Sequence, residues 1–342
     1  MDVAEKERVA LITGGNTGIG LAVAQRLLED DPETHLCLLC RNRQRAESAV
    51  ETLKEMFPEA AVDILLMDVS NMASVYRAAS EIRDRYKRID LMYLNAGIMP
   101  GARVDWAAFF KGLFSTKCFH MFRTGAGILT QEDLDTSEGL KQVFATNVYG
   151  HFILVKELED QLGGNNHSTQ IIWTSSSNAS KEAFSMQDFQ HRYGREPYAA
   201  SKYATDLTSV ALNEKLNTKG VYSHTTCPGL AMTNLTYGIM HEVFWWIVLP
   251  ILWLIRLFAP GTTIYPYNSA ESLVWLSRQQ PQGLDPLCKF YSRTSVFGRR
   301  YVEQKKMKVK PEEANQLYEA MCSLEASVKE KVKIKEPHHD KN

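Results

Sequence analysis

The sequence has almost no net charge and no apolar run long enough to read plainly as a membrane span. Its 39 Lys and Arg residues are balanced by 40 Asp and Glu residues. This balance gives no indication of nucleic-acid binding, and we expect no nucleic-acid partner. The longest uncharged apolar run, Val243–Ile255, is shorter than the ~20 residues that cross a bilayer. The 342 residues, with 44% hydrophobic content, fit one large globular domain or two small ones.

The sequence also lacks a cysteine pattern typical of disulfides or metal sites. Among the 6 cysteines, Cys37 and Cys40 have CxxC spacing, but they lie in the apolar run Leu36–Cys40. Strand residues three apart point to opposite faces, so we expect buried thiols and no metal. Reduced cysteines fit a protein facing the cytosol, and we expect no secretory leader before the first strand. The sequons at Asn166, Asn178 and Asn234 are then expected to be unused.

Strand and helix patterns alternate along most of the chain. The predicted strands are Arg8–Thr13, His35–Cys40, Val62–Met67, Asp90–Leu94, Gln170–Thr174 and Val221–Thr226. The predicted helices are Ile19–Glu29, Arg43–Met56, Ser74–Tyr86, Ser137–Leu162 and Pro197–Asn217. This alternation predicts an α/β fold, a Rossmann-like doubly wound parallel sheet in a single domain. Ligands of such sheets bind beyond the carboxyl ends of the strands.

Two segments and the C-terminus depart from this alternation. We assign residues 1–310 to the domain, with an aromatic insertion at 99–130 and an apolar segment at 239–259. We expect residues 239–259 to contact a membrane, most readily in its interface, and the alternative is a buried lid over an apolar pocket. A C-terminal helix is predicted at 311–333 and a disordered tail at 334–342.

The basic run Lys305–Lys310 lies between this apolar segment and the C-terminal helix. Such a run is usually a solvated face, and beside apolar segments it is also suited to contact with anionic lipid. The apolar stripe of the C-terminal helix favours a core or dimer contact over a ligand site.

A glycine-rich loop follows the first strand and opens the first helix. Its glycines have GxxxGxG spacing, which lets the backbone turn tightly and approach a pyrophosphate at the helix N-terminus. The candidate dinucleotide-binding residues in this loop are Thr13, Gly14, Gly15, Asn16, Thr17, Gly18, Ile19 and Gly20.

The end of the second strand indicates which dinucleotide is bound. An NAD site usually has an acidic residue there, but this chain has Cys40-Arg41-Asn42-Arg43. Because a guanidinium matches a phosphate dianion, NADP(H) is favoured, with Arg41 as the leading phosphate ligand. The alternative is an ordinary surface arginine at a strand end.

Polar or small residues end the other strands, and each group could also be an ordinary turn. They are Asp68 and Val69, Asn95, Ala96 and Gly97, the cluster Thr174–Ser177, and Pro228 and Gly229 with Thr233 beyond them. Asn147 lies inside a predicted helix, where asparagine is a mediocre helix former. This small loss of helix stability suggests that Asn147 has a functional role.

Tyr198 and Lys202 are four residues apart on a predicted helix and therefore lie on one face. An ammonium close to a phenol stabilises the phenolate, so we expect the pKa of Tyr198 to fall toward neutral. Tyr198 is then a candidate proton donor. The spacing alone is common and is also typical of a surface helix pair.

These motifs together resemble the short-chain dehydrogenase/reductase family, over residues 8 to about 235. The resemblance rests on TGGNTGIG, NAG, a helical asparagine, a serine cluster, YAASK and PGLAMT in the family's order. It implies that Ser176 hydrogen-bonds the substrate oxygen, with Ser175 as the rival. It further implies that Tyr198 is the acid or base and that Lys202 binds the nicotinamide ribose. Tyr203, one residue past the lysine, is not the catalytic tyrosine. The wide spacing of Ser176 and Tyr198 leaves the choice of serine open.

The same resemblance assigns the remaining residues. Asn147 would hold a water of the proton relay, Asp68 and Val69 would flank the adenine, and Thr233 would bind the carboxamide. A closer similarity, to the steroid ketone reductases of this family, rests on YLNAGIMP, FFKGLFSTK, EPYAASKYATDL and NLTYGI. It implies NADPH-dependent reduction of 3-keto sterols to 3β-alcohols in cholesterol biosynthesis, and of estrone to estradiol.

That similarity also implies an endoplasmic reticulum membrane location with the catalytic domain facing the cytosol. The expected partners are a steroid ketone substrate, membrane lipid, a second copy of the chain joined through the two long helices, and other enzymes of sterol C-4 demethylation. Two alternatives stay open: a reductase of retinal or another lipid ketone, and a non-catalytic scaffold of a sterol-synthesis complex.

Overall fold

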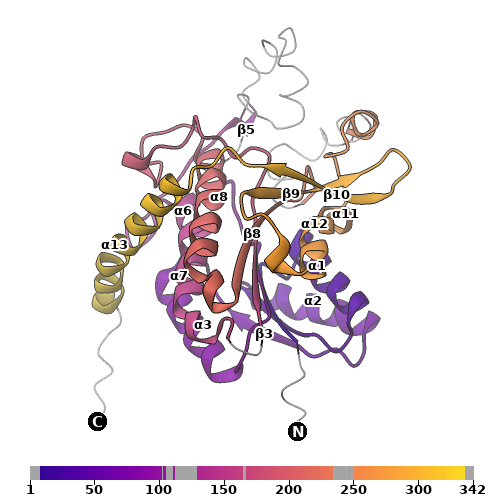
Figure 1. Ribbon diagram of the computed structural model, residues 1–342, viewed down its shortest axis with the longest axis horizontal. Coiled ribbons are helices and arrows are strands. Elements are labelled where there is room, and N and C mark those ends of the chain that lie inside the picture. The colour runs from indigo at the N-terminus through magenta and orange to yellow at the C-terminus, as the bar shows by residue number, and fades with distance from the viewer. Residues whose placement is uncertain are drawn as a thin grey trace.

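A twisted eight-stranded sheet forms the centre of the molecule (Figure 1). The computed structural model describes residues 8–101, 103–104, 111, 129–164, 167–233, 246, 250 and 252–335. The strand order is β10-β9-β8-β7-β4-β1-β2-β3, and every pair is parallel except β9–β10. Its strands are β1 Val9–Thr13, β2 His35–Cys40, β3 Val62–Leu66, β4 Leu91–Leu94, β7 Thr169–Thr174, β8 Val221–Cys227, β9 Cys288–Thr294 and β10 Arg300–Lys306. The predicted doubly wound fold is confirmed.

Helices cover both faces of the sheet (Figure 1). One face carries α1 Gly18–Asp30, α2 Arg43–Met56, α11 Pro266–Ser269 and α12 Glu271–Ser277. The other carries α3 Met72–Arg85, α7 Gly150–Glu157, α8 Pro197–Leu216 and α13 Pro311–Lys335. The helical C-terminal extension is therefore part of the fold.

The two cysteines of the CxxC sequence lie on opposite faces of β2, as predicted. Cys37 packs in the core beneath α3 and α7, and Cys40 in the core beneath α1 and α2. Burial raises the pKa of Cys37 to about 12 and that of Cys40 to about 11, so both thiols stay protonated. Within the described ranges, no group of His, Cys, Asp and Glu side chains could hold a metal ion.

The predicted long helix from Ser137 to Leu162 is shorter and interrupted. Gly139 has a φ of +78° and lies in a turn closed by a hydrogen bond from Thr136 N to the Leu140 carbonyl, so the helix begins only at Gln142. It then runs as α6 Gln142–Phe144, a π-helical segment Ala145–Tyr149, α7, and a 3₁₀ turn Glu159–Gln161. A π segment is rare and often lies at a functional site.

The segment between residues 260 and 310, where the sequence analysis predicted no helix or strand, has regular structure. It contains α11, α12, and the strands β9 and β10, which form an antiparallel hairpin at the sheet edge. The short pair β5 Arg103–Val104 and β6 Leu129–Thr130 lies apart from the main sheet. The rest of the predicted aromatic insertion, apart from residues 99–101, 111 and 130, lies outside the described residues.

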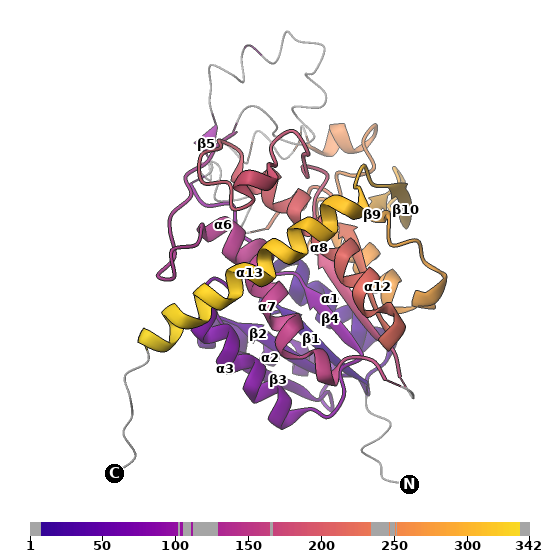
Figure 2. The same cartoon turned by 60° about the vertical axis from the view of Figure 1, so that its left-hand side comes forward.

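Helix α13 lies across the outer side of α7 and α8 (Figure 2). Its fully buried side chains pack into the same core as those two helices; they are Ala314, Leu317, Met321 and Val328. Because α8 is covered by the sheet on one side and α13 on the other, nearly its whole length is buried. The outer surface of α8 is therefore an internal contact of this chain.

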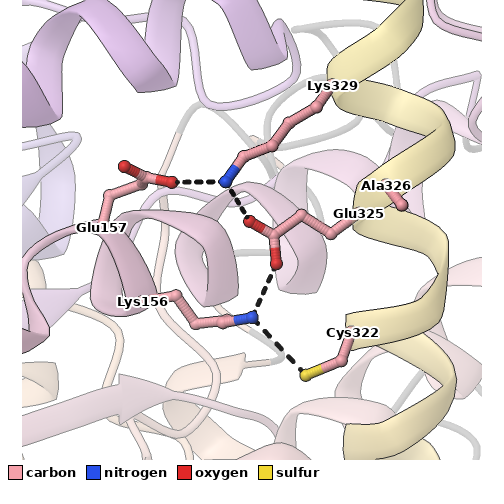
Figure 3. A pocket seen from close by; sticks show the side chains of 6 residues that line it. All are labelled: Lys156, Glu157, Cys322, Glu325, Ala326 and Lys329. Carbon is pink, nitrogen blue, oxygen red and sulfur yellow. Dashed lines mark hydrogen bonds and ion pairs between the residues drawn. The ribbon is translucent and has the colours of Figure 1, made fainter.

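Ion pairs bridge α7 and α13 along a shallow groove of about 430 Å³ (Figure 3). Lys156 Nζ lies 2.6 Å from Glu325 Oε2, and Lys329 Nζ lies 3.0 Å from Glu157 Oε1. Lys156 Nζ also contacts Cys322 Sγ at 3.6 Å. We call this set the α7–α13 ion-pair groove.

Most of the predicted apolar segment 239–259 lies outside the described residues. Residues 252–256 are helical, and Leu254 and Phe258 are 61% and 75% exposed. Phe297, at the tip of the β9–β10 hairpin, is 99% exposed. Across the part of the chain that the structure describes, no helix is both long and apolar enough to cross a membrane.

Candidate active site

The glycine-rich loop makes contacts that only glycine allows. Gly14 and Gly18 have φ values of +66° and +56°, the left-handed region that other residues rarely adopt. A Cβ on Gly20 would lie 2.3 Å from the Gly14 carbonyl oxygen, so a side chain there would force the loop apart. The loop is thus folded tightly over the end of β1, at the carboxyl edge of the sheet.

Helix α1 begins without a side-chain cap, in contrast to the two helices that follow it in the chain. Asn42 caps α2 and Asn71 caps α3, each by accepting a hydrogen bond from a backbone N–H. Thr17 at the start of α1 makes no such bond, and the first turn of α1 has no acidic residue. The free N–H groups and positive end of α1 are therefore available to an anion.

Arg41 lies directly after β2, beside the glycine-rich loop. Its side chain is exposed and makes no hydrogen bond or ion pair with any described residue. The neighbouring Arg43, by contrast, pairs with Glu47 at 3.7 Å. Arg41 is thus a cation that the described residues leave unengaged, at the position where the sequence predicts a phosphate ligand.

Thr13 braces the end of β1 against the end of β4. Its Oγ1 accepts hydrogen bonds from the backbone N–H groups of Asn95 and Ala96, each at 2.9 Å. The same oxygen lies 2.9 Å from His151 Nε2 on α7. Thr13 is almost fully buried, and its side chain holds the ends of these two strands together.

Asn147 joins the end of β4 to the helix that carries the tyrosine. Its Oδ1 accepts from Ile98 N at 2.8 Å, and its Nδ2 donates to the Ile98 carbonyl at 3.1 Å and to Ser201 Oγ at 2.9 Å. Both amide protons are used within the protein, so the side chain donates no hydrogen bond to the expected relay water. A Cβ on Gly97 would lie 3.3 Å from Asn147 Oδ1 and 3.6 Å from Lys202 Nζ, so these three residues converge.

Tyr198 and Lys202 lie together on the first turns of α8. Lys202 Nζ is 5.5 Å from the centre of the Tyr198 ring, and it donates a 2.7 Å hydrogen bond to the Thr174 carbonyl. Gln131 Oε1 accepts from Tyr198 N at 3.0 Å and so satisfies one free N–H at the start of the helix.

The expectation of a lowered tyrosine pKa is wrong for the protein without ligands. Burial raises the pKa of Tyr198 to about 12, opposed by a hydrogen bond from the side chain of Ser176. Burial also lowers the pKa of Lys202 to about 8, which still leaves this side chain as an ammonium at neutral pH. The site therefore keeps Tyr198 as a neutral phenol, the form that can donate a proton.

The two rival serines lie in different environments. Ser175 is buried, and its hydroxyl donates to Asp206 Oδ1 at 2.6 Å. Ser176 is partly exposed, and its side chain lies close enough to that of Tyr198 to act on the pKa of the phenol, which it lowers. The Ser175 proton is committed to the core, so Ser176 is the serine that can face a substrate.

The other predicted cofactor residues line the same edge. Asp68 Oδ1 accepts from Ser70 N and Oγ at 2.9 and 2.7 Å, which closes a turn after β3. Gly229 has a φ of +79°, and a Cβ on Gly18 would lie 3.3 Å from Thr233 Cγ2. Thr233 therefore lies beside the glycine-rich loop, although it follows β8. Of the remaining predicted positions, Ile19 lies in the first turn of α1, and the others lie in these same loops and turns; they are Gly15, Asn16, Val69 and Pro228.

Three polar residues at this site were absent from the sequence analysis. Asp206 and Lys289 form a buried ion pair at 2.7 Å behind the serine cluster, and His151 bonds Thr13. Asp206 lies one turn beyond Lys202 on a helix predicted from sequence, and that spacing was a usable signal. Lys289 gave no signal, because no strand was predicted around it.

Comparison with known proteins agrees with this geometry. A family model described as short chain dehydrogenase matches residues 8–242. The chain is 49% identical to the 3-keto-steroid reductase/17-beta-hydroxysteroid dehydrogenase 7 of Rattus norvegicus, with 97% of this chain and 99% of that protein covered. It is 50% identical to the Homo sapiens protein of the same name, over 94% of each chain. A 3-keto-steroid reductase of Schizosaccharomyces pombe is 32% identical over 95% of this chain and 98% of its own length.

Solved structures share the fold at lower identity. Salutaridine reductase from Papaver somniferum superposes with a TM-score of 0.58 at 21% identity, covering 83% of this chain and 99% of its own. The Pseudomonas aeruginosa protein RhlG, solved as a complex with NADP, gives a TM-score of 0.55 at 19% identity, covering 79% and 89%.

Proposed function

The chain belongs to the short-chain dehydrogenase family, and on that basis we propose that it is an NADPH-dependent reductase of steroid ketones. Its principal reaction is reduction of the 3-keto group of sterol intermediates to the 3β-alcohol in cholesterol biosynthesis. A second reaction is reduction of estrone to estradiol. The observation that carries the proposal is Tyr198, Lys202 and Ser176 together at the carboxyl edge of the sheet, in a chain about half identical to proteins named for this chemistry.

The residues at this edge fit NADPH. The uncapped start of α1 and the tight glycine loop suit a pyrophosphate. The guanidinium of Arg41, which pairs with no residue that the structure describes, suits the 2′-phosphate. Lys202 and Thr233 would lie along the nicotinamide end. When bound, NADPH supplies the hydride that reaches the carbonyl carbon.

The protein's own groups then manage the charge on the substrate oxygen. The Ser176 hydroxyl donates a hydrogen bond to the carbonyl oxygen and polarises it. Tyr198 gives its phenolic proton to that oxygen as negative charge develops. Its raised pKa suits this direction, because the phenol is fully protonated at neutral pH and an alkoxide is the stronger base. The ammonium of Lys202 lies close enough to stabilise the phenolate that remains.

Replacement of Tyr198 tests the catalytic assignment. Tyr198→Phe removes the proton donor while keeping the ring, so kcat is expected to fall by about 10² to 10⁴. NADPH binding, followed by fluorescence, is expected to stay within about twofold of wild type. A variant with normal turnover would remove Tyr198 from the mechanism.

Replacement of Arg41 tests cofactor choice. Arg41→Ala removes a charge-assisted contact to the 2′-phosphate, so the KM for NADPH is expected to rise at least tenfold while that for NADH stays unchanged. Arg43→Ala is the matched control, because Arg43 already pairs with Glu47. Equal use of NADH and NADPH by the wild-type enzyme would refute the role of Arg41.

The substrate is identified by comparing three carbonyl compounds in separate reactions. Purified full-length protein would be incubated with NADPH and either zymosterone, estrone or retinal, and the alcohols identified by mass spectrometry. Turnover of zymosterone supports the principal reaction, and turnover of retinal alone would replace it with the retinal reductase alternative. No turnover of any of the three carbonyl compounds would favour the non-catalytic scaffold.

We also propose that the protein works at the endoplasmic reticulum membrane, with its catalytic domain facing the cytosol. Exposed apolar side chains support a membrane contact: Trp246, Trp253, Leu254, Leu257, Phe258 and Phe297. Gly298 lies near Arg256, so the hairpin tip and residues 252–258 are side by side (Figure 1). Aromatic side chains beside arginine are typical of an interfacial anchor. Flotation with neutral and anionic vesicles tests this contact, and Phe297→Ser with Phe258→Ser is expected to abolish it.

The expected protein partners are part of the same proposal. α13 covers the outer side of α8, so a homodimer would need another surface or would displace α13. Light scattering in detergent would give the oligomeric state. Co-purification from microsomes would test contacts with other enzymes of sterol C-4 demethylation.

A further inference from the structure

A buried ion pair lies directly behind the serine cluster. Lys289 on β9 and Asp206 on α8 have side chains that are each 4% exposed, and Nζ lies 2.7 Å from Oδ2. Lys289 Nζ also donates to the Ser176 carbonyl at 2.9 Å. The other oxygen of Asp206 accepts the Ser175 hydroxyl at 2.6 Å. The pair therefore hydrogen-bonds two consecutive residues after β7, Ser175 and Ser176.

Lys202 grips the residue before them. Its Nζ donates to the Thr174 carbonyl at 2.7 Å, so three consecutive residues at the end of β7 are each held by a side chain from another element. Lys202 and Asp206 are one turn apart on α8. The same helix thus positions the serine segment and carries Tyr198.

Stability alone does not account for this arrangement. Burial of two charges is expensive, and apolar residues of similar size often stabilise a core as well or better. Burial raises the pKa of the Asp206 carboxyl despite its bond to Lys289, which reflects that expense. A pair that contributes little stability and touches the backbone of Ser176 is better explained by the geometry that it imposes.

We propose that Asp206 and Lys289 are positioning residues for the ketone reduction: they fix Ser176 against Tyr198 and supply the carboxylate that faces Lys202. This inference rests on the proposed function for the reaction, but the ion pair can be tested with any ketone that the wild-type enzyme reduces. Neither residue is required to touch substrate. A displacement of about 1 Å at a reacting group can lower the rate about 100-fold, so positioning at this distance matters.

The first test separates positioning from stability. Lys289→Met removes the bond to the Ser176 carbonyl, and kcat is expected to fall about 10- to 100-fold with little change in the Kd for NADPH. Lys289→Arg, which keeps the cation, is expected to recover a large part of kcat. Arg26→Met is the matched control, because Arg26 and Glu271 form a buried ion pair at 2.7 Å on α1 and α12. It should lower the melting temperature but leave kcat unchanged.

The second test uses the electrostatic effect on Lys202. Burial and the nearby Lys289 lower the pKa of Lys202. The Asp206 carboxylate raises it, and Cys227 raises it to a lesser degree. Tyr198 and His151 are also near. Asp206→Asn removes the carboxylate that favours the ammonium, so Lys202 is expected to lose its proton at a lower pH than in wild type. ¹³C NMR of lysine-labelled protein without cofactor, with Lys202→Arg for assignment, measures this directly.

Clear outcomes would overturn the proposal. Folded Lys289→Met and Asp206→Asn proteins with wild-type kcat and an unchanged Lys202 titration would reduce the pair to a structural role. If the single variants do not fold, Asp206→Leu with Lys289→Met replaces both charges by apolar groups and should restore folding but not kcat. Full activity of this double variant would also contradict the proposal. If the wild-type enzyme reduces no ketone, the NMR titration still tests the electrostatic arm.

Discussion

One cluster of lysines and carboxylates joins α8 to β9 and another joins α7 to α13, and the two differ in depth. The Asp206–Lys289 pair is buried, and each charge has a second partner in the backbone or side chains of the serine segment. The α7–α13 ion-pair groove contains more charges and is more exposed: Glu325 is buried, but the Lys329 side chain is 45% exposed (Figure 3). Solvent screens the second cluster and not the first. The same residue types therefore position the serine segment in the Asp206–Lys289 pair, but add little to the contact between α7 and α13.

The largest effect is expected from breaking the buried pair. Lys289→Met leaves the Asp206 carboxylate buried without its cation, which should lower the free energy of unfolding by about 3–5 kcal/mol. Urea denaturation would measure this, and the double variant Asp206→Leu with Lys289→Met should recover most of the loss. A loss of less than about 1 kcal/mol in the single variant would show that the two clusters are energetically alike.

Apolar burial, not the groove, should hold α13 in position. Leu317 is fully buried between α13 and the core, so Leu317→Ala should lower the free energy of unfolding by about 2–5 kcal/mol. Glu319→Ala, on the exposed side of the same helix, is the control and should change little. Similar effects of the two changes would mean that α13 is held by its surface charges.

Acid should lower the free energy of unfolding through two buried histidines. Burial lowers the pKa of His151 to about 3 and that of His224 to about 4, below the unfolded value of 6.5. The unfolded chain therefore binds protons first, and the free energy of unfolding should fall as pH drops from about 6.5 toward 4, by up to about 1.4 kcal/mol per pH unit for each histidine. His224→Phe should halve this dependence, and a profile identical to wild type would exclude His224.

The smallest effect is expected in the groove. Lys329→Met removes partly exposed pairs to Glu157 and Glu325, so the free energy of unfolding should fall by no more than about 1 kcal/mol. The difference from wild type should shrink further at about 1 M salt, because screening weakens exposed pairs. A loss that exceeds that of Lys289→Met would invert the comparison.

The sequence analysis predicted the parts of the site that depend on residue type at fixed spacing, and the roles of these residues stay predictions. The glycine loop, Arg41, and the Tyr198–Lys202 pair could be predicted because local backbone geometry and charge determine their chemistry. The choice between Ser175 and Ser176 depended on Asp206, and the partner of Asp206 lies on β9, far along the chain. Such a pairing depends on sheet order and register, which no local pattern contains.

Two further expectations failed for physical reasons. The pKa of Tyr198 was expected to fall because Lys202 is near, but desolvation of the phenolate raises this pKa to about 12. The helix expected from Ser137 begins at Gln142, because a left-handed glycine at 139 closes a turn first. Proximity and periodicity were correct in both cases, but burial and backbone conformation decided the outcome.

Helix α13 has a consequence for the order in which the molecule is assembled. It follows every strand of the sheet in the chain, yet its apolar side covers α8, which is made before β8, β9 and β10. During synthesis one apolar side of α8 therefore stays uncovered until α13 has been made, because this contact is distant in sequence. Folding of this chain is completed from its end, and a ribosome that stops before residue 311 would leave a protein with a finished site and an open core.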